Sequence, residues 1–370
     1  MILYYIPLIL LGLVAFFELQ LPQVKVGIIS VSVVAVFLIL FAGFRTVGPD
    51  FAEYTNYFNM SYQPELLERL GVEPAYIYIN SLVKTNNWPF QIVLFIIATI
   101  AIVPKLYFIK KYSPYVFPAL VVYYSTVFLI KEMGQIRHGV AMGFVLMAFG
   151  LMSEKRNWAA LFLVIVALQF HYSAVCVLPA FLMVNRQISS MKIWVIITLL
   201  FPLVLVDVKP FFNAIVNAIP VEGVRSKGEF YLNSPMFGFS VGLDSSVVLR
   251  IVVMAAMLYY RDAIIEKFPT FNTFLNLYFI GICYYLAFSS VSEFAQRTSV
   301  YFRSLEIIIL PSFILLGKTL GEKLLIGLVI IVNGAFTVYK LLENPLGYEM
   351  FNGYSNQLMT WIADWVNVIN

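Results

Sequence analysis

Charged residues, cysteine and histidine are all scarce in this sequence. Only 12% of the 370 residues are charged, whereas 61% are apolar, which lies outside the range of soluble globular domains. The two cysteines, Cys176 and Cys283, lie inside apolar stretches and indicate buried side chains rather than a disulfide or a zinc site. The only histidines are His138 and His171. A metal site is therefore not expected.

The sequence also lacks internal repeats, low-complexity tracts and a second, soluble domain. It offers no acidic pair suited to a metal–nucleotide complex, so no cofactor is expected. The first apolar segment has neither a basic region before it nor a small-residue cleavage site, which favours a retained span over a signal peptide. Residues 1–370 are expected to form a single integral membrane domain.

Apolar windows of membrane-spanning length recur along the whole chain and predict an all-α polytopic membrane protein with about 12 spans. Residues 157–184 are too long for one upright helix and short for two, and they are flanked by basic residues at both ends. We interpret them as a short hairpin that turns at Phe170-His171-Tyr172. The predicted spans are 2–17, 26–44, 90–108, 114–131, 136–152, 157–170, 172–184, 191–206, 246–261, 271–289, 300–317 and 322–340.

Short basic turns fix the expected orientation, because Lys and Arg in short loops stay on the inner side. The turns assigned to that side include Lys25 and Lys105. Both termini then lie outside, together with loops at about 45–89 and 207–245 and a tail at 341–370. The tail segment Trp361–Val366 is a candidate interfacial helix with two tryptophans.

Charges collect at the predicted outer ends of the spans, where a charge at the edge of hydrocarbon is costly. Arg45 and Asp50 bracket the helix-stopping pair Gly48-Pro49. The other such positions are Glu73 before Pro74, Arg137 at a helix start, His171 at the hairpin turn, and Arg297 with Arg303.

Each of these residues also has a purely structural interpretation. Arg45 would reach lipid phosphates, Arg297 would mark a loop end, His171 would be an ordinary loop histidine, and Glu73 would be a helix N-terminal charge. Two would form ion pairs, Arg137 with Glu132 and Arg303 with Glu306.

The excess of arginine favours a ligand instead. Arginine binds phosphate bidentately and stays charged in a poor solvent. Several arginines at one membrane face indicate a ligand with concentrated negative charge and a tail in the bilayer, which describes a lipid-linked pyrophosphate. The tyrosines near them are candidates for sugar contacts, including Tyr54, Tyr76, Tyr172 and Tyr301.

Taken in order, these short motifs resemble the EpsG family, the Wzy-like polymerases of bacterial exopolysaccharide, capsule and O-antigen. The motifs run from about residue 40 to about residue 305, and His138 departs from the glutamine that is common in the family. They are Arg-x-x-Gly-x-Asp-x-x-x-Tyr at 45–54, Glu73, Ile-Arg-x-x-Val-Ala at 136–141, His-x-Ser-Ala at 171–174 and the segment 297–303.

The resemblance implies a membrane glycosyltransferase with a fold like the GT-C class, in the bacterial cytoplasmic membrane. It would transfer a glycan from undecaprenyl pyrophosphate to the sugar hydroxyl of a lipid-linked repeat unit on the outer side. A chain-length regulator is a further partner of such enzymes, and no nucleic acid is involved.

For the mechanism we expect direct, metal-independent displacement with inversion at the anomeric carbon. Arg45, Arg137 and Arg303 would hold the pyrophosphate, with Arg297 as a fourth candidate. His171 is narrowly favoured as the base, and Asp50 would orient an arginine or a hydroxyl. Glu73 is an alternative candidate for the role of His171 or of Asp50.

Three other functions remain open at this point. A flippase for lipid-linked glycan would also need arginines facing a cavity, but it predicts repeats and broken helices at mid-membrane depth. An O-antigen ligase shares the combination of arginine and histidine. A membrane acyltransferase is the third.

Overall fold

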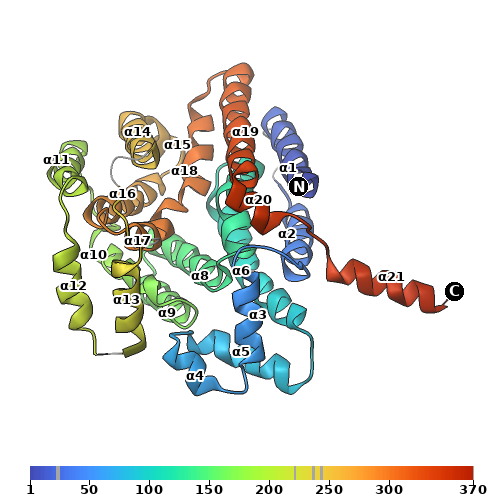
Figure 1. Cartoon of the computed structure of the whole chain (residues 1–370). Helices are drawn as coiled ribbons and strands as arrows, with labels where there is room; N and C mark the ends of the chain where they lie inside the picture. The colour runs from blue at the N-terminus through green and yellow to red at the C-terminus, as the bar shows by residue number, and fades with distance from the viewer. Residues whose placement is uncertain (22–25, 221, 236–237, 242–244, 370) are drawn as a thin grey trace.

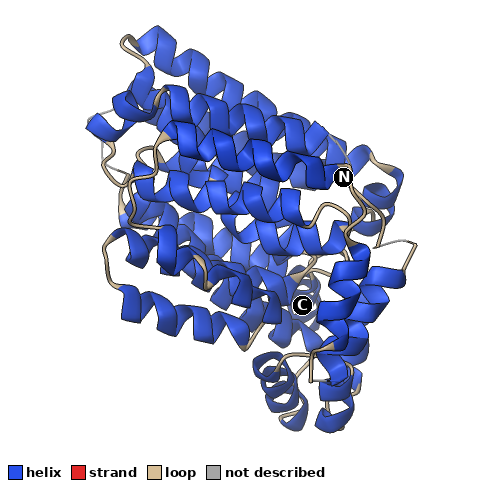
Figure 2. Cartoon of the chain, turned by 90° about the vertical axis from the view of Figure 1, so that its left-hand side faces the viewer, coloured by secondary structure: helices blue, strands red, loops and turns tan. Residues whose placement is uncertain are grey.

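The computed structural model describes residues 1–21, 26–220, 222–235, 238–241 and 245–369. Helices make up all the regular structure of these residues, and a single bridge pairs Arg45 with Asn356. Figure 2 shows this all-helical architecture. Lys25 and Asp244, which the sequence places in an inner turn and an outer loop, lie outside the described residues.

The helices of the first half of the chain are α1 (Ile2–Gln20), α2 (Ile28–Gly43), α3 (Phe51–Asn59), α4 (Pro64–Arg69), α5 (Pro74–Thr85), α6 (Phe90–Tyr112), α7 (Val116–Tyr123), the π-helix η1 (Tyr124–Glu132), α8 (Ile136–Ser153), α9 (Asn157–Leu168), the 3-10 helix η2 (Tyr172–Val177) and α10 (Ala180–Met183).

The second half contains α11 (Ser190–Leu200), η3 (Phe201–Val204), α12 (Lys209–Asn217), α13 (Glu222–Asn233), α14 (Ser245–Tyr259), α15 (Arg261–Lys267), α16 (Phe271–Ala287), α17 (Ser292–Arg303), α18 (Glu306–Ser312), η4 (Phe313–Leu316), α19 (Leu320–Glu343), α20 (Pro345–Phe351) and α21 (Gln357–Ile369).

Within the described part of the chain, four helices are long and apolar enough to cross a membrane, namely α1, α6, α8 and α19, and the number rises to six if two bent pairs each count as one span. One bent pair joins α11 and η3 to α12 at 92°, and the other joins α17 to α18 and η4 at 49°. Shorter apolar helices include α2, α9, α14 and α16. The protein is therefore an all-helical, polytopic membrane protein.

Helices α1, α2 and α19 present large apolar side chains outward, among them Ile9, Val33 and Phe336, each more than half exposed. Because water does not favour such a surface, these faces are suited to contact lipid. Helix α8 is buried along most of its length and packs against α6 and α9. A Cβ at Gly143 of α8 would lie 2.9 Å from the carbonyl oxygen of Ala101 in α6, so glycine allows this close approach.

Two groups of short helices extend beyond the same end of the bundle and form what we call the helical cap. The first group is α3–α5 and the second is α12–α13 (Figure 1). The groups meet where α4 contacts α13, although Arg69 at the end of α4 precedes Glu222 at the start of α13 by 153 positions in the sequence. The two predicted outer loops are thus largely helical and lie on one side of the bundle.

The C-terminal segment connects the two ends of the chain. The Tyr4 hydroxyl donates to the carbonyl oxygen of Phe351 (3.0 Å), and the Tyr354 hydroxyl donates to that of Phe41 (2.9 Å). Thr46 hydrogen-bonds Ser355 (2.7 Å). Helix α21 then leads away from the bundle (Figure 1) and exposes apolar side chains, which agrees with the predicted helix at 361–366.

Several expectations from the sequence are wrong in detail. Lys105 is not in an inner turn but is fully buried within α6, where its ammonium forms an ion pair with Glu132 (2.9 Å). Helix α17 already begins at Ser292, so Arg297 lies on a helix and does not mark a loop end. The chain does break between α9 and η2, at the expected turn around His171.

Candidate functional site

The site is built where the helical cap meets the buried ends of α8 and α17. Arg137 lies in the first turn of α8, and its guanidinium forms an ion pair with the carboxylate of Glu73, just before α5. The Glu73 and Arg137 side chains are only 4% and 12% exposed. An anion at a helix N-terminus also compensates the dipole there. The expected alternative, an ion pair of Arg137 with Glu132, is wrong because Glu132 pairs with Lys105.

Three tyrosines surround the Arg137 guanidinium. Its Cζ lies 5.8 Å from the ring centres of Tyr54 and Tyr76 and 5.5 Å from that of Tyr57, within cation–π range. Tyr54 and Tyr76 are buried, and burial raises the pKa of both hydroxyls. In this conformation these two rings contact the arginine and not the surface.

Asp50 is the exposed carboxylate near this arginine. It has a left-handed backbone with φ of 58° and precedes α3. No ion pair or side-chain hydrogen bond joins it to the residues that the structure describes. Limited hydration and the neighbouring Glu53 raise the pKa of Asp50, whereas the charges of Arg297, Arg137 and Lys131 oppose that rise. A free carboxylate with a raised pKa is suited to accept a proton.

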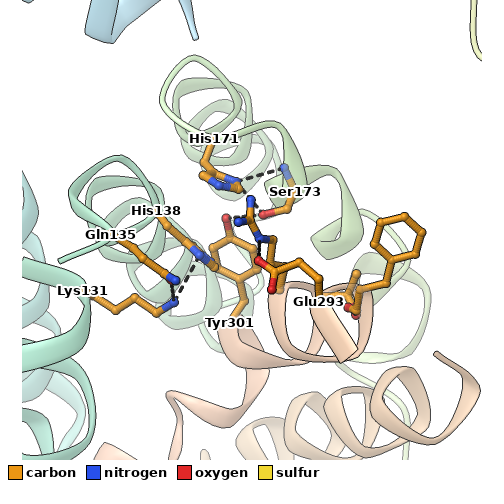
Figure 3. Close-up of polar contacts among 10 residues, drawn as sticks. Lys131, Gln135, His138, His171, Ser173, Glu293 and Tyr301 are labelled. Carbon is orange, nitrogen blue, oxygen red and sulfur yellow. Dashed lines mark hydrogen bonds and ion pairs between the residues drawn. The ribbon is translucent and has the colours of Figure 1, made fainter. Parts of the chain in front are cut away.

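The two histidines of the chain stack on each other. The rings of His138 in α8 and His171 before η2 lie 4.6 Å apart at 25°, and Tyr301 of α17 lies 4.7 Å from His138 (Figure 3). His138 Nδ1 lies 3.2 Å from the ammonium of Lys131, which also donates to the side chain of Gln135. The Nε2 atom of His138 is buried and has no partner among the described residues.

The Nδ1 atom of His171 is engaged by Ser173. It accepts from the Ser173 backbone N–H (3.3 Å) and lies 2.7 Å from the Ser173 hydroxyl, which is 3.0 Å from the Tyr301 hydroxyl (Figure 3). A neutral imidazole that accepts at Nδ1 carries its proton on Nε2. His171 is therefore arranged to donate a hydrogen bond from Nε2.

Arg297 and Arg303 lie on α17 but have different partners. Arg297 forms an ion pair with Glu293 one turn earlier, and its Cζ lies 4.6 Å from the ring of Tyr231. Arg303 has no hydrogen bond or ion pair with the described residues. The expected pairing of Arg303 with Glu306 is wrong, since Glu306 accepts from the Tyr278 hydroxyl (2.8 Å).

Arg45 does not reach the surface in this conformation. It is fully buried, donates from Nη1 to the carbonyl oxygen of Ala42 (2.7 Å), and has no described partner for Nε or Nη2. Gly48 covers it, because a Cβ there would lie 3.2 Å from Arg45 Nε and 2.4 Å from the carbonyl oxygen of Met133. Burial lowers the pKa of Arg45 to about 10, so the side chain stays charged at neutral pH.

The structure thus joins Glu73 to Arg137 directly and His171 to Tyr301 through the Ser173 hydroxyl, and it exposes Tyr172 next to His171. Reasoning from the sequence missed Lys131 and Arg250. Lys131 stands one residue before Glu132 near the end of an apolar segment, and Arg250 interrupts an apolar run. Each is a charge inside a predicted span, a signal of the kind that marks functional sites in membrane proteins.

Comparisons with known proteins indicate the family of this chain. The model of the EpsG family matches residues 28–356, a range that contains all the site residues described above. The chain is also 28% identical over 312 residues to the amylovoran biosynthesis protein AmsC of Erwinia amylovora, covering 78% of this chain and 81% of that protein. No solved structure matches the chain. The protein belongs to the EpsG family.

Proposed function

We propose that this protein is a polysaccharide polymerase of the bacterial cytoplasmic membrane. It transfers a glycan chain from undecaprenyl pyrophosphate to a sugar hydroxyl of a lipid-linked repeat unit, on the outer side of the membrane. Membership of the EpsG family and similarity to a protein of exopolysaccharide biosynthesis support this class of activity. The proposal includes about 12 spans, some of them formed by the shorter helices, and a fold like the GT-C class.

One observation carries the chemistry. Asp50 is an exposed carboxylate without a described partner, and Arg297, Arg137 and Lys131 act on it electrostatically. A proton acceptor beside several cations is what transfer from a pyrophosphate requires, because the hydroxyl must lose a proton while the leaving group gains charge. This observation favours a transferase over a flippase, which needs no base.

The reaction is a single displacement. The hydroxyl oxygen of the acceptor forms a bond to the anomeric carbon, and the bond from that carbon to the pyrophosphate oxygen breaks. The lipid pyrophosphate leaves with the electron pair, and the hydroxyl proton passes to Asp50. The configuration at the anomeric carbon inverts, and no step requires a metal ion or a nucleotide sugar.

The other residues receive supporting roles. Arg137, Arg297 and Arg303 bind the pyrophosphate, and Arg45 shapes the loop that presents Asp50. His171 donates a hydrogen bond from Nε2, which its contact with Ser173 supports, so we assign the base role to Asp50 rather than to His171. Glu73 positions Arg137. Tyr172, which is 40% exposed, is the tyrosine best placed to contact a sugar. Tyr54, Tyr76 and Tyr301 are buried and support the site without contacting the sugar.

Product analysis tests the class of activity. Purified protein in lipid discs would receive its lipid-linked repeat unit, with and without a lipid A core acceptor and an acyl donor. A lengthened glycan supports the polymerase. Glycan on the core, an acylated glycan, or glycan moved across the disc without extension would instead identify a ligase, an acyltransferase or a flippase.

A further inference from the structure

Arg250 is a buried arginine that the proposed mechanism does not use. It lies on α14 and is 6% exposed, in a helix whose other described residues are mostly apolar. Its Cζ lies 3.9 Å from the ring of Tyr285 on α16, and its Nη1 atom has no partner among the described residues. A buried guanidinium with an unsatisfied N–H is costly unless a ligand completes it.

Two further cations are electrostatic neighbours of this arginine. Arg303 is the charged group that acts most strongly on Arg250, and it is also the one that acts most strongly on Lys131. Arg303 follows Tyr301 by two residues, and Tyr301 contacts His138, the partner of Lys131. Arg303 is therefore an electrostatic neighbour of both other cations, and the contacts of Tyr301 place its helix beside the candidate site.

Lys131, Arg250 and Arg303 differ from Arg137 and Arg297 in their partners. Arg137 and Arg297 are each neutralised by a carboxylate in direct contact, whereas Lys131 contacts the neutral groups of Gln135 and His138. Glu306 acts electrostatically on Arg250 and accepts from the Tyr278 hydroxyl. Glu293 and Glu132 act on Lys131, but they form ion pairs with Arg297 and Lys105. The group of Lys131, Arg250 and Arg303 thus keeps an excess of positive charge.

The surface beside Arg250 indicates where a lipid tail would lie. Val248, Leu249 and Val252 flank Arg250 in the sequence, and each is more than half exposed. Arg250 thus points into the bundle while its neighbours on the same helix point outward. A ligand with an anionic head and an apolar chain would place the head on Arg250 and the chain along the outer face of α14.

We infer that Lys131, Arg250 and Arg303 bind the diphosphate of an isoprenoid diphosphate, and that the isoprenoid leaves along Val248, Leu249 and Val252. This inference rests on the proposed function for its substrate class and adds Lys131 and Arg250 to the site. Two guanidinium groups and an ammonium match the charge of a diphosphate better than that of a monoester, because arginine binds phosphate oxygens bidentately.

Binding measurements test the inference without catalysis. Protein in phosphatidylcholine discs would be titrated with farnesyl diphosphate, inorganic pyrophosphate and farnesol. We expect farnesyl diphosphate to bind most tightly, and Arg250→Gln and Arg303→Gln to weaken it by about tenfold or more. Arg225→Gln is the control, because Arg225 lies in an exposed ion pair on α13 and its loss should leave binding unchanged.

A second substitution tests the lipid tail. Leu249→Asn should weaken farnesyl diphosphate and leave inorganic pyrophosphate unchanged. If Arg250→Gln unfolds the protein, Arg303→Gln decides, because its half-buried side chain is easier to replace. Wild-type affinity in a folded Arg303→Gln or Arg250→Gln variant would overturn the inference, as would displacement of farnesyl diphosphate by phosphatidylglycerol at equal concentration.

Failure of this inference and failure of the proposed function are distinguishable. Specific binding of farnesyl diphosphate by a protein that never extends glycan would retain the site and refute the polymerase. Glycan extension at the wild-type rate by Arg250→Gln, with unchanged binding, would retain the polymerase and refute the site.

Discussion

The guanidinium of Arg137 is bound by the carboxylate of Glu73, which lies 64 residues earlier in the chain. This contact ties the helical cap to the start of α8, the most buried long helix of the bundle. The rings of Tyr54, Tyr57 and Tyr76 contact the same guanidinium.

Removing Glu73 alone should be more damaging than removing the whole pair. Glu73→Ala leaves a buried, uncompensated Arg137, which costs on the order of 3–5 kcal/mol in well-buried pairs. The double variant Glu73→Ala/Arg137→Ala should recover part of that loss. Unfolding midpoints of the two single variants and the double variant form the cycle that measures the coupling. Additive effects would show that the pair is not coupled.

Lys105 and Glu132 provide a comparison within the bundle. Both side chains are fully buried, so Lys105→Met leaves a buried carboxylate and should destabilise the protein by about 3–5 kcal/mol. The control is Lys111→Met, because Lys111 pairs with Glu154 at the surface with 36% and 29% exposure, where such pairs contribute about 0–1 kcal/mol. Thermal unfolding of both variants in the same detergent makes the comparison. Equal losses would contradict this difference in burial.

The pH dependence of extension should report the ionisation of Asp50. Limited hydration and Glu53 raise its pKa, so the base form is lost at a higher pH than for an ordinary aspartate. Activity should therefore rise with pH through this raised pKa. Glu53→Gln removes a neighbouring negative charge that contributes to the raised pKa of Asp50. With Glu53→Gln the acid limb moves to lower pH. An unchanged limb would assign the base to another group.

The same shift predicts the sign of a stability effect. Because the folded state binds the Asp50 proton more tightly than the unfolded chain, the stability gained from this proton is full at low pH. It is lost as pH rises through the raised pKa of the folded state. Asp50→Asn should therefore leave the unfolding midpoint at neutral pH unchanged or slightly higher, while extension falls sharply. A lower midpoint would point to a structural role.

Two variants of His171 distinguish a hydrogen-bond donor from a general base at this position. The His171 Nδ1 atom accepts from the Ser173 backbone N–H, which places the proton of the neutral ring on Nε2. His171→Gln keeps an N–H donor but supplies no base, so it should retain more extension activity than His171→Ala. Initial rates at saturating substrate make the comparison. Equal, near-complete losses in both folded variants would return the base role to His171.

Particular residues show how far the sequence alone leads. The apolar windows predicted a helical membrane protein, and the Glu73-Pro74 and Gln135–Arg137 patterns predicted helix starts that the structure confirms at α5 and α8. The short motifs predicted the family correctly. These successes rest on local signals, namely hydropathy, proline and residue order.

Pairing between distant residues was not predictable in the same way. Glu132 is near Arg137 in the sequence, yet it pairs with Lys105, and Arg137 pairs with Glu73. Side-chain partners depend on how α5, α6 and α8 pack, and hydropathy carries no information on that. The burial of Arg45 beneath Gly48 depends likewise on the fold of the loop around Met133.

The most direct measurement is glycan extension by the purified protein. Its lipid-linked repeat unit would be supplied without nucleotide sugar and with a chelator, and the products of wild type, Arg137→Ala and Arg225→Gln would be run side by side. We predict a ladder of lengthened glycans from wild type and Arg225→Gln, and none from Arg137→Ala. The absence of a ladder from folded wild-type protein that still binds the lipid would contradict the assignment as a polymerase.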